Sequence, residues 1–191
     1  LVSGEGDLLD RLILEIVGLL DLAMTEEAQE ALKSGGTRSA EAASLYAQGL
    51  QAVPIAAARS ALERHDQKSS LEEAIELFTR AIEIDPGYAY AHASLGEAYF
   101  RLYRLNRSPE HFRLAEAHCR RALTLDDLVG QAWQTLGNIH TEVGRAEEAL
   151  DDLEKARARL PRSPEVHRDI AGAYTRMGRQ DEAEAQYRKA I

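Results

Sequence analysis

The sequence has one cysteine, one tryptophan, five prolines and no long uninterrupted apolar run. A single cysteine excludes an intrachain disulfide and any metal site built on several thiolates. The most apolar segment, residues 8–22, contains four charged side chains, at Asp10, Arg11, Glu15 and Asp21. A membrane helix needs about 20 predominantly apolar residues. We therefore expect no membrane insertion by this segment.

Patterns typical of strands and of catalytic sites are also missing. The alternation expected of strands is absent, and there is no serine elbow, phosphate-binding glycine loop or paired metal motif. His111 and His118 share a helical face, but the adjacent Cys119 points about 100° away from His118 and is expected in the core. We expect no catalytic residue, no cofactor and no metal ion.

The charge balance is acidic and the composition is that of a folded protein. The formal net charge is −9 and 45% of the residues are hydrophobic, which is enough for a continuous core. The overall field repels a nucleic-acid backbone. We therefore expect no nucleic-acid partner.

Apolar residues recur at helical spacing along the whole chain, which predicts an all-α protein. Two helices are predicted within residues 7–35, one from Ser39 to Pro54, and an alanine-rich one after it. Ser70 and Glu73 form a capping box, which predicts a new helix from residue 71 to about 84. Ser108-Pro109 and Ser163-Pro164 predict two further helix starts.

Small and large residues recur at matched offsets in the second half of the chain. The offsets are occupied by Trp133, Leu136, Gly137, Gly144 and Ala149, and 34 positions later by His167, Ile170, Ala171, Gly178 and Ala183. Small residues let paired helices cross closely, and the later glycine of each set suits a left-handed helix end. His92, Leu95 and Gly96 begin a similar unit that has seven additional residues. We predict about one extra turn on each of its helices.

These spacings resemble the tetratricopeptide repeat. The resemblance implies a right-handed superhelical solenoid with an N-terminal helical extension. It divides the chain into an extension (1–40), a degenerate first repeat (41–88), a repeat with the seven-residue insertion (89–129), a repeat (130–163) and a truncated repeat (164–191). The first helix of the degenerate unit is either residues 42–53, with the motif LYAQG, or residues 55–69.

A narrower resemblance covers most of the chain. Residues 8–49, followed by residues 71–100 and the inserted repeat, resemble the repeat half of multidomain bacterial signalling proteins. In those proteins a serine/threonine kinase or a winged-helix regulator, with a TolB-like segment, precedes the repeats. This resemblance implies a cytoplasmic location or, alternatively, the extracytoplasmic part of a membrane-anchored signalling protein.

The resemblance also implies a function, which is a non-catalytic scaffold that binds a protein or peptide on the concave surface. The predicted partner-binding groove consists of Tyr90, Glu97, Arg101, Gln131, Gln134, Asn138, Glu142, Arg168 and Arg176, together with Ala93, Ser94, Thr135, Glu165, Asp169 and Gly172. Asn138 matches an asparagine that grips peptide backbones in the family. The alternative is self-association, as a homodimer, through an exposed terminal repeat.

Overall fold

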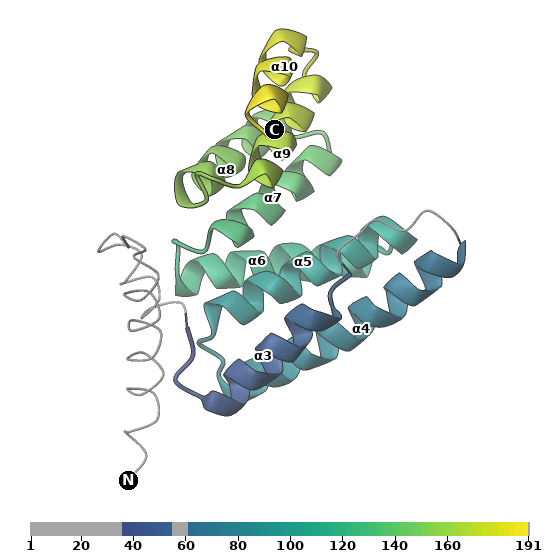
Figure 1. Ribbon diagram of the computed structural model, residues 1–191, viewed down its shortest axis with the longest axis vertical. Coiled ribbons are helices and arrows are strands. Elements are labelled where there is room, and N and C mark those ends of the chain that lie inside the picture. Colours follow the sequence, from purple (N-terminus) through teal and green to yellow (C-terminus); the bar gives the residue numbers. More distant parts are fainter. Residues whose placement is uncertain (1–35, 55–60, 191) are drawn as a thin grey trace.

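The computed structural model describes residues 36–54 and 61–190. Within these ranges all regular structure is helical, as predicted, and the helices follow one another as hairpins along the long axis of Figure 1. The helices are α3 (Ala40–Ala52), α4 (Ala61–Ile84), α5 (Ala89–Asn106), α6 (Pro109–Leu125), α7 (Gly130–Glu142), α8 (Ala146–Arg159), α9 (Pro164–Arg176) and α10 (Gln180–Lys189). The helices predicted within residues 7–35 lie outside the described residues.

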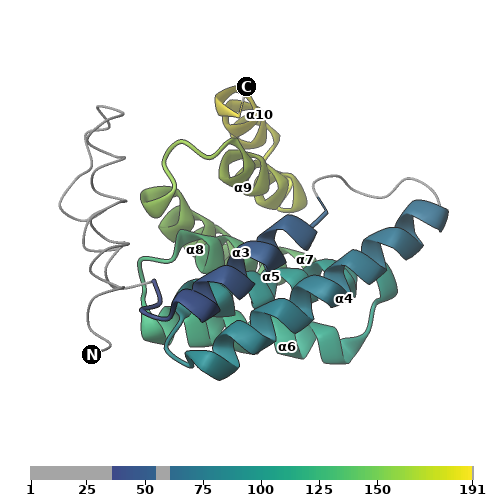
Figure 2. The ribbon, with the colours of Figure 1, turned by 60° about the horizontal axis from the view of Figure 1, so that its bottom comes forward.

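The helices pair as antiparallel hairpins, and each hairpin packs on the next. The pairs are α3–α4, α5–α6, α7–α8 and α9–α10. The second helix of each pair contacts the first helix of the next, and α5, α7 and α9 also contact one another in series. Figure 2 shows α3 and α4 side by side against the α5–α6 pair. This arrangement is a helical repeat solenoid, whose inner surface consists of α3, α5, α7 and α9.

A glycine in the first helix of three hairpins allows the close approach of the second helix. The contacts join Gly49 to Phe78, Gly96 to Cys119, and Gly137 to Leu153. A Cβ added at any of these glycines would lie 2.5 Å from the partner side chain. The predicted close crossing is therefore confirmed. Leu136 and Ala149 are buried, as the repeat pattern predicted. Trp133 is half-buried and packs against the cluster that contains Leu153 and Ile170.

The predicted helix start at Ser70 is wrong. Helix α4 runs without a break from Ala61 to Ile84, so the backbone at Ser70 is helical and cannot cap. Nothing in residues 61–70 breaks a helix, and Lys68 and Glu72 form an ion pair (3.4 Å) across the predicted boundary. Of the two alternatives for the degenerate unit, the structure shows the first, because α3 is the helix that pairs with α4.

The seven-residue insertion lengthens the α5–α6 hairpin. Helix α5 has 18 residues against 13 in α7, and α6 has 17 against 14 in α8. The gain is larger on the first helix than predicted. Ring contacts between Tyr103 and Phe112 (5.2 Å between centroids) hold the added turns together.

The turns after α5, α7 and α9 use left-handed backbone. Gly144 (φ 79°) and Gly178 (φ 76°) adopt it, as predicted, after α7 and α9. The corresponding residue after the lengthened α5 is Arg107 (φ 58°), whose side chain packs over the ring of Tyr103. An arginine is therefore fixed at the end of the added turns.

Candidate partner-binding surface

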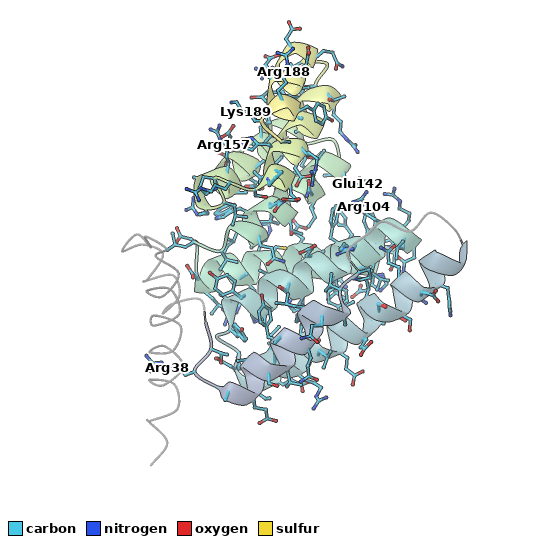
Figure 3. All side chains as sticks on the ribbon, viewed as in Figure 1. Arg38, Arg104, Glu142, Arg157, Arg188 and Lys189 are labelled. Atoms are coloured by element: carbon cyan, nitrogen blue, oxygen red, sulfur yellow. The ribbon has the colours of Figure 1, made fainter. Side chains whose placement is uncertain are left out.

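Glu142 joins three neighbouring helices at one end of the inner surface. It lies at the end of α7 and pairs with Arg107, which follows α5, and with Arg176 of α9 at 3.6 Å. The hydrogen bond from Arg107, and then the charges of Arg107, Arg176 and Arg104, lower the pKa of Glu142. Figure 3 labels Arg104 and Glu142 near each other, at the ends of α5 and α7. Three arginines thus surround one carboxylate.

Asp169 joins α9 to α7 in the middle of the surface. Its Oδ2 accepts hydrogen bonds from the amide nitrogens of Gln134 (2.7 Å) and Asn138 (3.0 Å). Burial raises the pKa of Asp169, and these two hydrogen bonds oppose the rise. Asn138, the predicted backbone-gripping residue, therefore already donates to a carboxylate of the next repeat.

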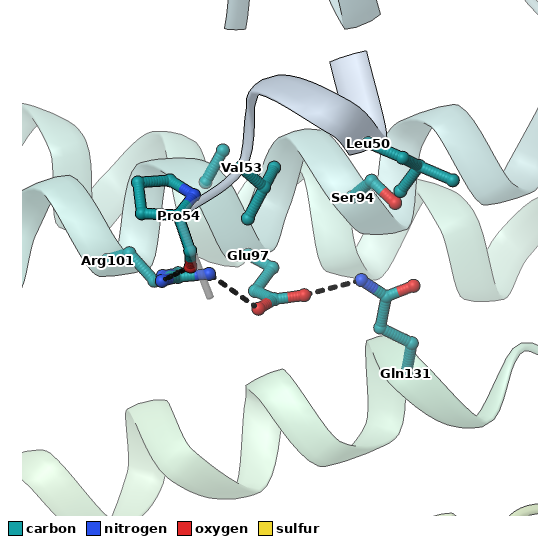
Figure 4. Close-up of a pocket in the computed structure, with 8 residues that line it drawn as sticks. Leu50, Val53, Pro54, Ser94, Glu97, Arg101 and Gln131 are labelled. Atoms are coloured by element: carbon teal, nitrogen blue, oxygen red, sulfur yellow. Dashed lines mark hydrogen bonds and ion pairs between the residues drawn. The ribbon is translucent and has the colours of Figure 1, made fainter. Parts of the chain in front are cut away.

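Glu97 joins α5 to α7 beside a pocket. Its carboxylate accepts a hydrogen bond from Gln131 (2.6 Å) and forms an ion pair with Arg101 (3.8 Å). Arg101 also donates to the backbone oxygen of Pro54, directly after α3. Figure 4 shows this chain of contacts from Pro54 to Gln131. The polar contacts fix α3, α5 and α7 around a common opening.

The pocket has a volume of about 200 Å³ and combines apolar walls with polar groups. Its lining consists of Leu50, Val53, Pro54, Ser94, Glu97, Ala98, Arg101 and Gln131. The side chain of Leu50 is 46% exposed at its edge. The predicted groove did not include Leu50, Val53, Pro54 or Ala98. Leu50, Val53 and Pro54 lie in or directly after α3. The sequence left open whether this helix or residues 55–69 pairs with the next one, so it did not place these side chains at the surface of the repeats.

The structure places the other predicted groove residues in three kinds of environment. Tyr90 is half-buried between two core clusters, and burial is the main cause that raises its pKa. Arg168 is exposed and pairs with Glu165 on its own helix (2.8 Å). Gly172 is partly exposed with open space around it. These residues lie outside the pocket.

Two predicted groove positions are wrong because they are buried. Ala93 is 0% exposed and Thr135 is 4% exposed, and both face helix contacts within the stack. Thr135 hydrogen-bonds with the Cys119 thiol. The tight crossing of α5 and α6 with α7 leaves no room for a partner there. Ser94 is also buried (3%) and pairs with the Tyr46 hydroxyl (3.3 Å), but it lines the pocket.

Histidines form two side-chain pairs that the sequence did not reveal. His140 and Asp152 are both buried, with 2.8 Å between Nδ1 and Oδ2. His92 and His118 have their Nδ1 atoms 3.1 Å apart, and the ring of His118 stacks on those of His92 and Tyr99. Burial, and then the charge of the neighbouring His92, together lower the pKa of His118 to about 4. His118 is therefore a neutral packing residue at neutral pH.

The cysteine considered for a metal site lies in the core. Cys119 is 0% exposed against Gly96, and burial raises its pKa. His118 faces His92, whereas His111 hydrogen-bonds with Asn106. Across residues 36–54 and 61–190, no three side chains of metal-binding type gather in one place.

Comparisons with known proteins agree with this architecture. Residues 67–102 match the family model described as TPR repeat. The chain is therefore similar to TPR repeat proteins over these residues. Residues 109–191 match the model of the bacterial transcriptional activator domain, which is consistent with the narrower resemblance to bacterial signalling proteins. No curated protein matches the sequence.

Solved structures share the repeat fold. A thermophilic TPR protein from Thermus thermophilus is 25% identical, with a TM-score of 0.57 over 67% of this chain and 71% of that one. The first TPR of Spaghetti (RPAP3), bound to the HSP90 peptide SRMEEVD, is 21% identical, with a TM-score of 0.56 over 75% and 98%. The first TPR domain of human RPAP3 is 20% identical, with a TM-score of 0.56 over 74% and 95%. Among the described helices, none is long and apolar enough to cross a bilayer.

Proposed function

We propose that this repeat protein is a non-catalytic scaffold that binds a peptide or protein segment on its inner surface, within a larger bacterial signalling or transcriptional regulator. The matches to the TPR repeat and to the bacterial transcriptional activator domain support this role. We retain the predicted units 41–88, 89–129, 130–163 and 164–191, and a cytoplasmic location, as part of the proposal. The net charge of −9 favours a protein over a nucleic acid as the partner.

The observation that carries the proposal is the pocket between α3, α5 and α7. Partner pockets typically combine an apolar surface with a few placed polar groups. Leu50, Val53 and Ala98 supply the first, and Glu97 and Gln131 the second. The polar network that joins three helices orders these groups before a partner arrives, which lowers the entropic cost of binding.

Binding without chemistry is supported by how the inner carboxylates are used. Glu97, Asp169 and Glu142 each accept hydrogen bonds from a neighbouring repeat. Their role is to hold the repeats in register.

A charge placed at the pocket edge tests the proposal. Peptides selected on the full chain from a random library are expected to bind Leu50→Glu at least about tenfold more weakly than wild type, because a carboxylate replaces apolar contact area. Leu128→Glu is the matched control, since Leu128 is 38% exposed and lies outside the pocket. Equal loss of affinity in both variants contradicts the proposal.

Self-association is the second candidate, and one observation favours it. Tyr187 of α10 is 46% exposed on the last described helix. An exposed aromatic side chain on a helix face is suited to contact with a second copy of the chain. Sedimentation velocity decides the matter: a dimer that dissociates in Tyr187→Glu supports this candidate, and a monomer at all concentrations rejects it.

A further inference from the structure

The turns added by the insertion carry arginines toward the inner surface. Gly96 and Gly137 hold equivalent places in α5 and α7, so Arg101 corresponds to Glu142, where α7 ends. Helix α5 continues for five more residues. Arg104 lies in this extension and Arg107 directly follows it, so both occupy turns that α7 lacks.

These arginines continue the face of α5 that lines the pocket. Positions 94, 97, 101 and 104 are separated by three or four residues, which places them on one side of a helix. Ser94, Glu97 and Arg101 line the pocket. Arg104 is therefore about 10 Å along the same face from Glu97, at 1.5 Å per residue.

Positive charge is in excess at this end of the surface. Arg107 and Arg176 share Glu142, whose side chain is only 21% exposed. Arg104 is exposed and, within the described part of the chain, forms no hydrogen bond or salt bridge, although its charge acts on both Glu142 and Asp169. Three positively charged arginines face the single carboxylate of Glu142. Positive charge still exceeds negative charge when the carboxylate of Asp169 is counted as ionised. The chain as a whole is strongly negative, so the local sign is opposite to the global one.

We propose that the arginine cluster of Arg104, Arg107 and Arg176 docks an acidic side chain of the partner peptide, about three residues away from an apolar side chain that enters the pocket. The separation follows from the 10 Å along α5 and the rise of about 3.3 Å per residue in an extended peptide. The inference rests on the proposed function and adds the chemistry of the partner. Planar guanidinium groups suit carboxylates because they form paired charge-assisted hydrogen bonds.

Selection on the full chain tests this inference. Random displayed peptides are enriched on the wild-type chain, and the enriched peptides are synthesised and titrated by fluorescence anisotropy. We expect an Asp or Glu about three positions from a large apolar residue. The double variant Arg104→Gln/Arg176→Gln is expected to bind these peptides about tenfold more weakly, because two exposed ion pairs are lost.

Matched variants separate a local contact from a general charge effect. Arg113→Gln/Arg120→Gln removes the same two charges from the outer helix α6, where the arginines pair with Glu110 and Glu116, and is expected to bind as wild type does. Arg104→Lys keeps the charge but loses the planar guanidinium, and is expected to bind less tightly than wild type and more tightly than Arg104→Gln. Raising the salt toward 1 M, where the Debye length falls to about 3 Å, is expected to weaken wild-type binding more than binding by the double variant.

The outcomes distinguish this inference from the proposed function. Peptides that depend on Leu50 but lack acidic residues, or bind the double variant as well as wild type, overturn the inference and leave the proposed function intact. A selection that enriches no peptide overturns both. Acidic peptides that lose affinity in both Leu50→Glu and the arginine double variant support both.

Discussion

At the scale of single residues, the close packing of paired helices depends on glycines, which have no side chain. Gly137 brings α7 against α8, with Leu153 above it and the Ala149 carbonyl oxygen beside it. Gly172 lies in α9, one residue past Ala171, which is the equivalent of Gly137, and has open space around it. The two glycines therefore predict opposite responses to the same substitution.

Gly137→Ala is expected to lower the free energy of unfolding by about 1–3 kcal/mol, because the new Cβ would lie 2.5 Å from Leu153 Cγ and must displace the core. Gly172→Ala is the control and is expected to raise it by about 0.5–1 kcal/mol, since alanine favours the helix and meets nothing. Urea unfolding measures both. A stabilising Gly137→Ala contradicts the close crossing.

The His92–His118 pair predicts how stability depends on pH. The folded-state pKa of His118, about 4, lies below its usual value of 6.5, so the unfolded chain binds more protons between these pH values. Stability contributed by neutral His118 is therefore present above pH 6.5 and is lost as the pH falls toward 4. Between pH 6.5 and pH 4, the free energy of unfolding of His118→Phe is expected to fall by about 1–2 kcal/mol less than that of the wild type. This difference is smaller than the full pKa shift implies, because the ring is only half-buried.

The measurement is the urea midpoint of wild type and variant between pH 7.5 and pH 4, a window set by the shift in the His118 pKa. Exposed His65→Phe serves as the control and is expected to keep the wild-type slope. An unchanged slope in His118→Phe means that His118 is not the group responsible.

At the scale of helices, the residues that precede helix starts can be compared between hairpins. Ser163 accepts a hydrogen bond from the Val166 amide (3.3 Å) at the start of α9. Ser108 occupies the same place before α6, and again Pro follows it, but its hydroxyl makes no capping bond. Sequence assigned the two serines the same role, and only the structure separates them.

Ser163→Ala is therefore expected to cost about 1 kcal/mol of stability, the usual value of a side-chain cap. Ser108→Ala is expected to change it by less than about 0.5 kcal/mol. Thermal unfolding followed by circular dichroism compares them. Equal losses would show that the Ser108 hydroxyl caps α6 in solution.

Much of the helix pattern was readable from the sequence, and its failure at Ser70 has a physical cause. The pairing of α7 with α8, the start of α3 at Ser39 and the left-handed turn at Gly144 follow from local rules, which the structure confirms. A capping-box motif shows only that a serine is able to cap a helix, and not that a helix begins at that residue. In α4 a continuous helix keeps its backbone bonds and buries Leu71 and Phe78, so the local signal is overridden.

At the scale of the whole molecule, the first helices of the hairpins form one surface. Hydrogen bonds between these helices add to the apolar packing that holds the hairpins together. Sequence located Glu97, Arg101 and Gln131, which the structure brings together at the pocket. It could not show that Asn138 and Gln134 are already bonded to Asp169, since that contact depends on how α9 packs on α7. It also missed Arg104, whose spacing from Arg101 was a usable signal.

A crystal structure of the chain with a selected peptide tests the central claim most directly. We expect the peptide on the inner surface, with an apolar side chain against Leu50 and an acidic one within hydrogen-bond distance of Arg104 or Arg176. A peptide seated instead on the outer helices α4, α6 and α8, away from the pocket, would contradict it.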